Sequence, residues 1–334
     1  MNKKAVALLS GGLDSTLAVK VLLDQGVEIV ALNFTSTFCT CSCRGSVCSN
    51  EAARVANEFG IPIKVLKKGL DYIEVIRNPK YGYGQGMNPC VDCRIYMHRL
   101  AKNYMGEIGA SFVITGEVLG QRPMSQRKDA FKSIEKESGL DGLIVRPLCA
   151  KHLDPTIPEK AGIIDREKLL DMVGRSRKPQ ISLAEECDIQ NYPCPSGGCL
   201  LTDKIFSKRV KDLLDNKKDV TTEDLQILKI GRHFRLNNET KIVIGRDEAE
   251  NKRLGNLVQP GDTLLEPLDF AGPTAMICGP VKNGTHSLAG RMILRYAGEK
   301  ADGKRFLKLS QNGEATIFEV DSPVDDKVLK GMMI

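Results

Sequence analysis

The stretch Lys4-Ala5-Val6-Ala7-Leu8-Leu9-Ser10-Gly11-Gly12-Leu13-Asp14-Ser15 decides how the first part of this chain folds. Its apolar run predicts a buried strand of a parallel sheet, and residues 14–25 predict the helix that follows. The two adjacent glycines remove Cβ atoms from the turn, so that successive backbone N–H groups can point into one concavity. The hydroxyls of Ser10 and Ser15 and the N-terminus of the helix add donors and a positive dipole end. The turn is therefore predicted to bind pyrophosphate.

Strands and helices alternate after this turn. Apolar runs predict further strands over residues 27–34, 61–66 and 112–115, with helices over residues 50–59 and 94–108 between them. This alternation is typical of right-handed crossovers in a doubly wound parallel sheet. Ligands of such sheets bind at the carboxyl ends of the strands. The glycine turn, Phe34 and the run Thr115-Gly116-Glu117 all follow strands, so we expect them at one edge of the sheet.

The length of 334 residues suits two or three domains. The first is predicted to cover residues 1–205 and to include a helix over residues 165–174. A helix over residues 203–215 then leads into a region rich in predicted strands. The expected fold class is α/β, a doubly wound parallel sheet followed by a smaller C-terminal α+β domain over residues 206–334.

The composition is that of a soluble protein with a packed core, because hydrophobic residues make up 42% of the chain and charged residues 27%. No apolar run approaches the roughly 20 residues that span a bilayer, and the first residues lack the pattern of a signal peptide. We therefore expect a cytoplasmic protein with no membrane partner. The net charge of +6 mildly favours a polyanionic partner.

Eleven cysteines are unusual in a reducing compartment, where clustered thiols indicate metal, cluster or sulfur chemistry rather than disulfides. Cys90 and Cys93 form a CxxC pair beside a predicted helix, and Cys194 and Cys199 frame a glycine-containing turn. A structural zinc site, a redox pair and a [4Fe–4S] cluster all fit these spacings. A further quartet after the second strand is open to three interpretations, a second metal site, a sulfur relay or a structural zinc knot; its members are Cys39, Cys41, Cys43 and Cys48.

The string from Ser10 to Ser15 resembles the PP-loop of the ATP pyrophosphatase superfamily, whose members split ATP between the α and β phosphates to adenylate a substrate oxygen. The sequence contains no Gly-x-x-x-x-Gly-Lys-Ser/Thr string, which argues against a Walker-type NTPase. The resemblance implies an adenine nucleotide alpha hydrolase-like fold that binds ATP and Mg²⁺. The expected nucleotide contacts are Ser10, Gly11, Gly12, Asp14, Ser15, Phe34, Thr115, Gly116 and Glu117.

Other motifs are similar to those of tRNA thiouridylases, over about residues 4–205. Residues 114–121, continuing to 124–126, and residues 145–148 look like segments of the ThiI-type 4-thiouridine synthases. The frame Asn88-Pro89-Cys90-Val91-Asp92-Cys93 and the run Gly197-Gly198-Cys199 resemble the cysteine segments of the MnmA-type 2-thiouridylases. The resemblance implies that the substrate receives sulfur.

In the cluster-dependent thiouridylases, a CxxC pair and one distant cysteine hold a [4Fe–4S] cluster. The resemblance thus implies Cys90, Cys93 and Cys199 as ligands, with Cys194 as the alternative third ligand and Zn²⁺ as the alternative metal. It also implies Asp14, Cys93 and Cys199 as the catalytic residues. In cluster-free relatives two cysteines instead carry a persulfide and resolve it as a disulfide, which is the main rival mechanism.

Residues 228–235 and 244–251 are similar to segments of the NFACT-R RNA-binding domain, which occurs fused to predicted thiouridylases. Arginine suits bidentate contacts to phosphate. The alternative is a merely solvated charged face, since the region also carries many acidic residues. The expected RNA contacts are Arg232, His233, Arg235, Arg246, Lys252 and Arg253.

Together these observations predict an ATP-dependent tRNA thiouridylase that adenylates a uridine carbonyl and replaces its oxygen with sulfur. Its expected partners are tRNA, a sulfide or persulfide donor and a second copy in a homodimer. The first rival is a PP-loop sulfur transferase or ligase that acts on a small molecule. The second is an RNA-binding adaptor with a degenerate nucleotide site, although the intact Ser10–Ser15 string argues against degeneracy.

Overall fold

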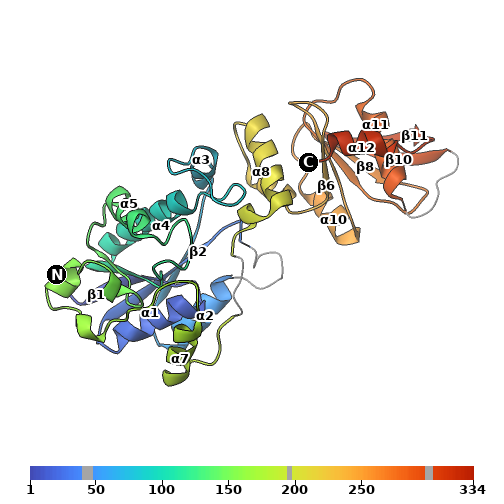
Figure 1. Ribbon diagram of the computed structural model, residues 1–334. Helices are drawn as coiled ribbons and strands as arrows, with labels where there is room; N and C mark the ends of the chain where they lie inside the picture. The colour runs from blue at the N-terminus through green and yellow to red at the C-terminus, as the bar shows by residue number, and fades with distance from the viewer. Residues whose placement is uncertain (40–47, 194–197, 298–303) are drawn as a thin grey trace. The chain divides into compact units, whose positions relative to one another are not determined.

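The computed structural model describes residues 1–39, 48–193, 198–297 and 304–334. The chain divides into two compact units, Met1–Thr202 and Asp203–Ile334, each with its own sheet (Figure 1). The sequence-based domain boundary, after residue 205, falls just inside the second unit. No helix of the described residues is both long enough and apolar enough to cross a bilayer.

The first unit is built on a five-stranded parallel sheet in the order β3-β2-β1-β4-β5. The order reverses next to β1, which is where ligands of doubly wound sheets bind. The α/β fold predicted from the sequence is thus confirmed. The strands are β1 (Lys4–Leu8), β2 (Glu28–Thr35), β3 (Ile63–Lys67), β4 (Phe112–Thr115) and β5 (Ile144–Val145).

Alternate residues of the central strand face two different cores. Ala5 and Ala7 pack under α1 (Leu13–Leu23), α2 (Cys48–Glu58) and α7 (Lys178–Glu186). Val6 faces the opposite core, which α4 (Cys90–Glu107) and α5 (Lys128–Ser138) cover. Figure 1 shows these two helical layers on either side of the sheet. Burial on both faces explains why the strands are apolar almost without interruption.

The helix expected over residues 165–174 is wrong. The structure has only a 3-10 helix, Arg166–Lys168, followed by extended backbone. Leu170 N–H donates to the carbonyl of Pro147, and Met172 N–H donates to that of Leu148. Pairing with this neighbouring segment satisfies the backbone and buries Leu169 without a helix. The other short helices of the unit are α3 (Tyr72–Arg77), α6 (Ile157–Lys160) and the 3-10 helices Ala150–His152 and Leu200–Thr202.

The second unit is built on a six-stranded sheet in the order β11-β10-β8-β9-β7-β6, with antiparallel neighbours. Ile242 and Ile244 face a core that contains α11 and α12, and Val243 between them faces α9 and α10. The elements are α8 (Lys204–Asn216), α9 (Thr222–Ile227), β6 (Arg232–Arg235), β7 (Lys241–Ile244), α10 (Glu248–Asn256), β8 (Thr263–Pro267), β9 (Ala275–Cys278), α11 (Thr285–Tyr296), β10 (Arg305–Gln311), β11 (Glu314–Val320) and α12 (Asp326–Met332). The expected α+β character of this region is confirmed.

Candidate active site

The turn between β1 and α1 is closed by its own serines. Ser10 N–H donates to Ser15 Oγ over 3.2 Å, and the two hydroxyl oxygens lie 3.0 Å apart. Ser15 Oγ also donates to the carbonyl of Gly12 over 2.9 Å. These hydrogen bonds fix the conformation of the turn from Ser10 to Ser15. The backbone N–H groups within the turn are therefore held in place for a ligand.

Two glycines let other segments approach this turn. Gly11 has a φ of +77°, and a Cβ there would lie 2.6 Å from the backbone of Glu51 in α2. A Cβ on Gly116, just after β4, would lie 2.5 Å from the carbonyl oxygen of Asp14. Only glycine fits at either position. The structure therefore joins the start of α1, the start of α2 and the end of β4 at one edge of the sheet.

Asp14 has one engaged and one open carboxylate oxygen. Gln121 Nε2 donates to Asp14 Oδ2 over 3.1 Å. Oδ1 is buried and has no hydrogen-bond partner among the described residues. A buried, unpaired carboxylate oxygen is costly unless a ligand or water satisfies it. Asp14 thus suits the expected contact with Mg²⁺ or water, although the sequence analysis assigned no role to Gln121.

Glu117 is engaged within the fold. Its carboxylate is 2% exposed and pairs with Arg146 Nε at 3.2 Å and Arg94 Nε at 3.3 Å. Burial alone would raise the pKa of Glu117, but the two arginines lower it. The side chain ties β4 to α4 and β5, and the backbone carbonyl of Glu117 accepts a hydrogen bond from Cys149 Sγ over 3.3 Å. Thr115 is also buried, and Phe34 is half-buried.

Cys93, in the first turn of α4, is surrounded by groups that favour its thiolate. Lys68 Nζ donates to Cys93 Sγ over 3.0 Å, and the same ammonium lies 4.5 Å from the ring centre of Tyr72. Burial would raise the pKa of Cys93, but the charge of Lys68 and hydrogen bonds from Lys68 and Tyr72 lower it overall. The sequence analysis missed Lys68 and Tyr72. Lys68 follows β3, so its place at the carboxyl edge was the available signal.

The other thiols near Cys93 have raised pKa values, unlike Cys93. Burial raises the pKa of Cys199 to about 12, with a contribution from Cys93. Burial and the neighbouring Cys93 also raise the pKa of Cys90. All three thiols raise the pKa of Tyr72, and Cys93 is the one that hydrogen-bonds to it. Cys93 is therefore the thiol of this group that is best suited to act as a nucleophile.

Cys199 is positioned by backbone pairing with two earlier loops. It forms an antiparallel bridge with Cys39, and Leu200 N–H donates to the carbonyl of Phe38 over 2.8 Å. Met87 N–H donates to the carbonyl of Leu201 over 3.0 Å. This pairing holds the end of the first unit against the loops after β2 and before α4.

The described cysteines do not form a ready metal site. No three His, Cys, Asp or Glu side chains of the described residues are grouped so that they could hold a metal ion. Cys194, the alternative third ligand, lies outside the described residues, as do Cys41 and Cys43 and the side chain of Cys48. The [4Fe–4S] cluster expected on Cys90, Cys93 and Cys199 therefore stays a prediction.

Arg122 directly follows Gln121, which contacts Asp14, and the sequence analysis missed it. Burial and the charge of Arg94 lower the pKa of Arg122, whereas Cys90, Asp14 and Cys199 counteract that shift. Although neighbouring protein atoms lower its pKa, Arg122 as a whole residue keeps contact with solvent, and it forms no ion pair among the described residues. It is thus available to an anionic ligand at this edge.

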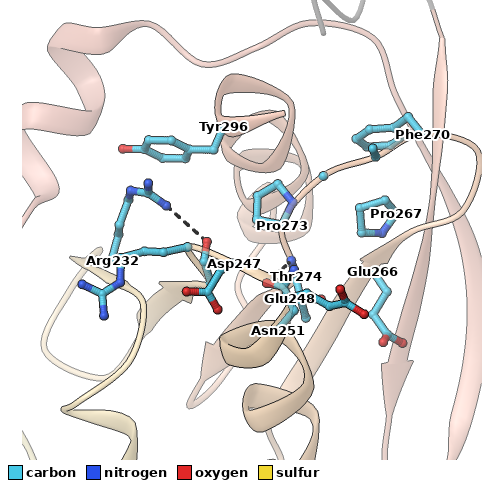
Figure 2. Close-up of a pocket in the computed structure, with 14 residues that line it drawn as sticks. Arg232, Asp247, Glu248, Asn251, Glu266, Pro267, Phe270, Pro273, Thr274 and Tyr296 are labelled. Atoms are coloured by element: carbon cyan, nitrogen blue, oxygen red, sulfur yellow. Dashed lines mark hydrogen bonds between the residues drawn. The ribbon is translucent and has the colours of Figure 1, made fainter. Parts of the chain in front are cut away.

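The expected RNA contacts in the second unit differ in how accessible they are. Arg232 and Arg246 line a pocket (Figure 2), and Lys252 and Arg253 are exposed on α10. Arg235 donates two hydrogen bonds of 2.7 Å to Asp212. The expectation for His233 is wrong, because its ring is 1% exposed and its Nε2 lies 2.8 Å from the carbonyl oxygen of Ile230. Burial, with Lys241 and Arg209, lowers its pKa.

Comparison with known families matches each unit to a different one. Residues 1–165 match the family described as "Thiamine biosynthesis protein (ThiI)". Residues 231–330 match the family described as "NFACT protein RNA binding domain".

Individual relatives match over part of the chain. A tRNA-specific 2-thiouridylase MnmA of Clostridium acetobutylicum is 33% identical over 35% of this chain and 36% of its own length. A probable tRNA sulfurtransferase of Methanothermobacter thermautotrophicus is 30% identical over 35% of this chain and 30% of its own length. The chain thus spans about a third of the length of these relatives. A solved 4-thiouridine synthetase–RNA complex with bound ATP has a TM-score of 0.36 and 23% identity, covering 68% of this chain and 52% of that one.

Proposed function

We propose that this chain is an ATP-dependent tRNA thiouridylase. Its residues 1–165 match the ThiI family, and its residues 231–330 match the NFACT RNA-binding domain. The observation that carries the proposal is that Gly116 after β4 packs against Asp14 of the phosphate turn while Lys68 after β3 donates to Cys93, all at the carboxyl edge of one sheet. A nucleotide held by the turn and a sulfur carried by the cysteines would therefore meet at one edge of the sheet.

The first step is adenylation of the uridine. The turn from Ser10 to Ser15 holds the β and γ phosphates of ATP through its backbone N–H groups. The uridine carbonyl oxygen attacks the α-phosphorus; the new oxygen–phosphorus bond forms as the bond to pyrophosphate breaks. Mg²⁺, bound with help from the open oxygen of Asp14, would neutralise phosphate charge. Arg122 stabilises the charge that develops on the α-phosphate.

The second step brings in sulfur through Cys93. A persulfide carrier transfers its outer sulfur to the Cys93 thiolate, which Lys68 and Tyr72 stabilise. The persulfide sulfur attacks the adenylated carbon and AMP leaves. The Cys199 thiol, once deprotonated, attacks Cys93 Sγ; this releases thiouridine and leaves a Cys93–Cys199 disulfide. A dithiol reductant then returns both cysteines to thiols. This sequence balances one sulfur atom and two electrons in each cycle.

The proposed role of Cys93 favours the persulfide mechanism over the [4Fe–4S] cluster mechanism. The sequence resemblance favoured a cluster held by Cys90, Cys93 and Cys199. An ammonium donating directly to Cys93 Sγ suits a nucleophilic thiolate, and no step is routed through a cluster. Anaerobic purification separates the two mechanisms. A colourless protein without iron supports the persulfide route, whereas brown protein with about four irons per chain would restore the cluster.

The test of the function itself is nucleoside mass spectrometry of tRNA from a strain that lacks this chain. We expect one thiolated uridine to disappear and the wild-type chain to restore it, whereas Asp14→Ala and Cys93→Ser fail to do so. Cys187→Ser at the end of α7 is the matched control and should restore it fully. An unchanged thionucleoside profile would refute the tRNA substrate and favour a small-molecule sulfur acceptor.

A further inference from the structure

The second unit contains a pocket of about 610 Å³ that the proposed chemistry does not use. Its walls come from β6, the start of α10, the loop between β8 and β9, and the end of α11 (Figure 2). The volume is sufficient for one nucleotide, since small-molecule sites span about 300–1,000 Å³.

One wall of the pocket is formed by a stacked pair of planar groups. The Arg232 guanidinium carbon lies 4.5 Å from the ring centre of Tyr296. Arg232 Nη1 also donates to the carbonyl of Gly245 over 3.2 Å, so the guanidinium is fixed in orientation. Phe270 and Pro273 lie on another side of the pocket (Figure 2). Planar guanidinium and aromatic groups are the surfaces on which unstacked RNA bases stack.

The floor of the pocket is fixed before any ligand arrives. Asn251 Oδ1 accepts a hydrogen bond of 3.0 Å from Thr274 N–H, which joins α10 to the start of β9. Gly245 lies so close to Asn251 that a Cβ at this position would collide with its amide oxygen. Asp247 Oδ1 accepts from Glu250 N–H over 2.9 Å and caps α10. A floor that is already ordered lowers the entropic cost of binding.

Carboxylates in the pocket restrict the kind of ligand. Arg246 is bound to Glu250 by its own Nε at 3.0 Å, so part of its charge is neutralised. Glu248 lines the pocket, is exposed and has no ion pair or hydrogen bond among the described residues. Glu266 has only Lys308, at 3.9 Å, as its partner in that same set. A simple anion would be repelled by these carboxylates, and a purely apolar ligand would leave them without donors.

We propose that this pocket binds one unpaired guanine nucleotide of an RNA strand. Guanine offers adjacent N1–H and N2–H donors to the Glu248 carboxylate, and its face stacks beside Arg232 and Tyr296. Uracil has a single ring N–H between two carbonyls, and adenine and cytosine each offer one amino group. The exposed Lys252 and Arg253 of α10 are available to the strand's phosphates. This inference rests on the proposed RNA substrate and adds which nucleotide the second unit reads.

The test measures binding of fluorescent RNA heptamers to the full chain, with G, A, C or U at the centre of an otherwise uridine strand. We expect the guanine heptamer to bind about tenfold more tightly than the uridine heptamer, which is within the range of a bidentate base contact. Glu248→Gln should remove most of this preference. Glu314→Gln, which removes an exposed carboxylate on β11 outside the pocket, is the matched control and should keep it.

Equal binding of the four heptamers, or a guanine preference that survives in Glu248→Gln, would overturn the proposal, as would the absence of any binding. Far-UV circular dichroism of the two variants shows that loss of preference does not reflect unfolding. The thionucleoside assay separates this inference from the proposed function. A chain that restores thiouridine without a guanine preference refutes only the pocket; a guanine preference without thiolation refutes only the enzyme.

Discussion

The ammonium nitrogen of Lys68 lies 3.0 Å from the sulfur of Cys93 and 4.5 Å from the ring centre of Tyr72, so a single cation contacts both groups. Lys68 comes directly after β3 and Cys93 lies in the first turn of α4. The contact therefore depends on the tertiary fold and is sensitive to a single side-chain change.

Lys68→Met should slow the alkylation of Cys93 severalfold at neutral pH. The charge of Lys68 lowers the pKa of Cys93, so its removal raises that pKa and reduces the thiolate fraction. Iodoacetamide labelling followed by peptide mass spectrometry measures the rate at Cys93 separately from the other cysteines. Lys67→Met, at the exposed neighbouring position, should leave the rate unchanged. Equal rates in the two variants would show that Lys68 does not stabilise the thiolate.

Gly116→Ala should destabilise the first unit by about 2 kcal/mol or more, since the new methyl would lie 2.5 Å from the backbone of Asp14. Weaker ATP binding should accompany this loss, because the turn must shift. Gly106→Ala in α4 is the matched control with the opposite sign. No described atom lies near its Cβ position, so we expect a gain of about 0.5–1 kcal/mol. Urea unfolding measures both, and a stable Gly116→Ala would contradict the close packing.

The stability of the first unit should fall as the pH is lowered from about 6.5 to 4. His98 is fully buried, and burial lowers its pKa to about 4 despite the opposing charge of Glu117. Within this window the unfolded chain binds a proton that the folded chain excludes, so unfolding is favoured by up to about 3 kcal/mol. Arg94 and Arg146 also face this histidine and oppose its protonation.

His98→Gln should flatten the dependence of the unfolding free energy on pH between about 4 and 6.5. His152→Gln, at an exposed position, should retain the full slope. Glu117 acts at lower pH: its lowered pKa contributes stability above the unfolded value, and this is lost as the pH falls through the folded value. The same slope in wild type and His98→Gln would assign the effect to other groups.

Arg122→Met should reduce thiouridine formation about 100-fold while leaving stability within about 0.5 kcal/mol. Arg122 as a whole residue keeps contact with solvent and forms no ion pair among the described residues, so the fold does not depend on it. A charged donor at a reacting phosphate contributes on the order of 100-fold to the rate. Arg127→Met, an exposed arginine paired only locally with Asp129, is the matched control. Full activity of Arg122→Met would remove it from the mechanism.

Local sequence patterns predicted the parallel sheet and the phosphate turn because both depend on short-range features. An apolar strand followed by paired glycines has few alternative structures. The helix predicted over residues 165–174 was wrong because Leu169 and Met172 also suit an extended segment. Pairing with residues 147–148 favours that extended structure. Tyr72 and Arg122 carry no local signature, and Lys68 carries only its place after β3. The fold brings Lys68 and Tyr72 to Cys93. His233 looked like part of a basic run, but its place on β6 buries it.

The backbone pairing of residues 199–201 with Phe38, Cys39 and Met87 has a consequence for synthesis of the protein. Cys93 leaves the ribosome long before Cys199, so β1 to β4 can pair while the site still lacks its last thiol. Non-local contacts of this kind form late because closing the intervening loop is entropically costly. In the proposed mechanism, the phosphate turn therefore forms before Cys199 arrives, and sulfur transfer waits until the whole first unit has emerged.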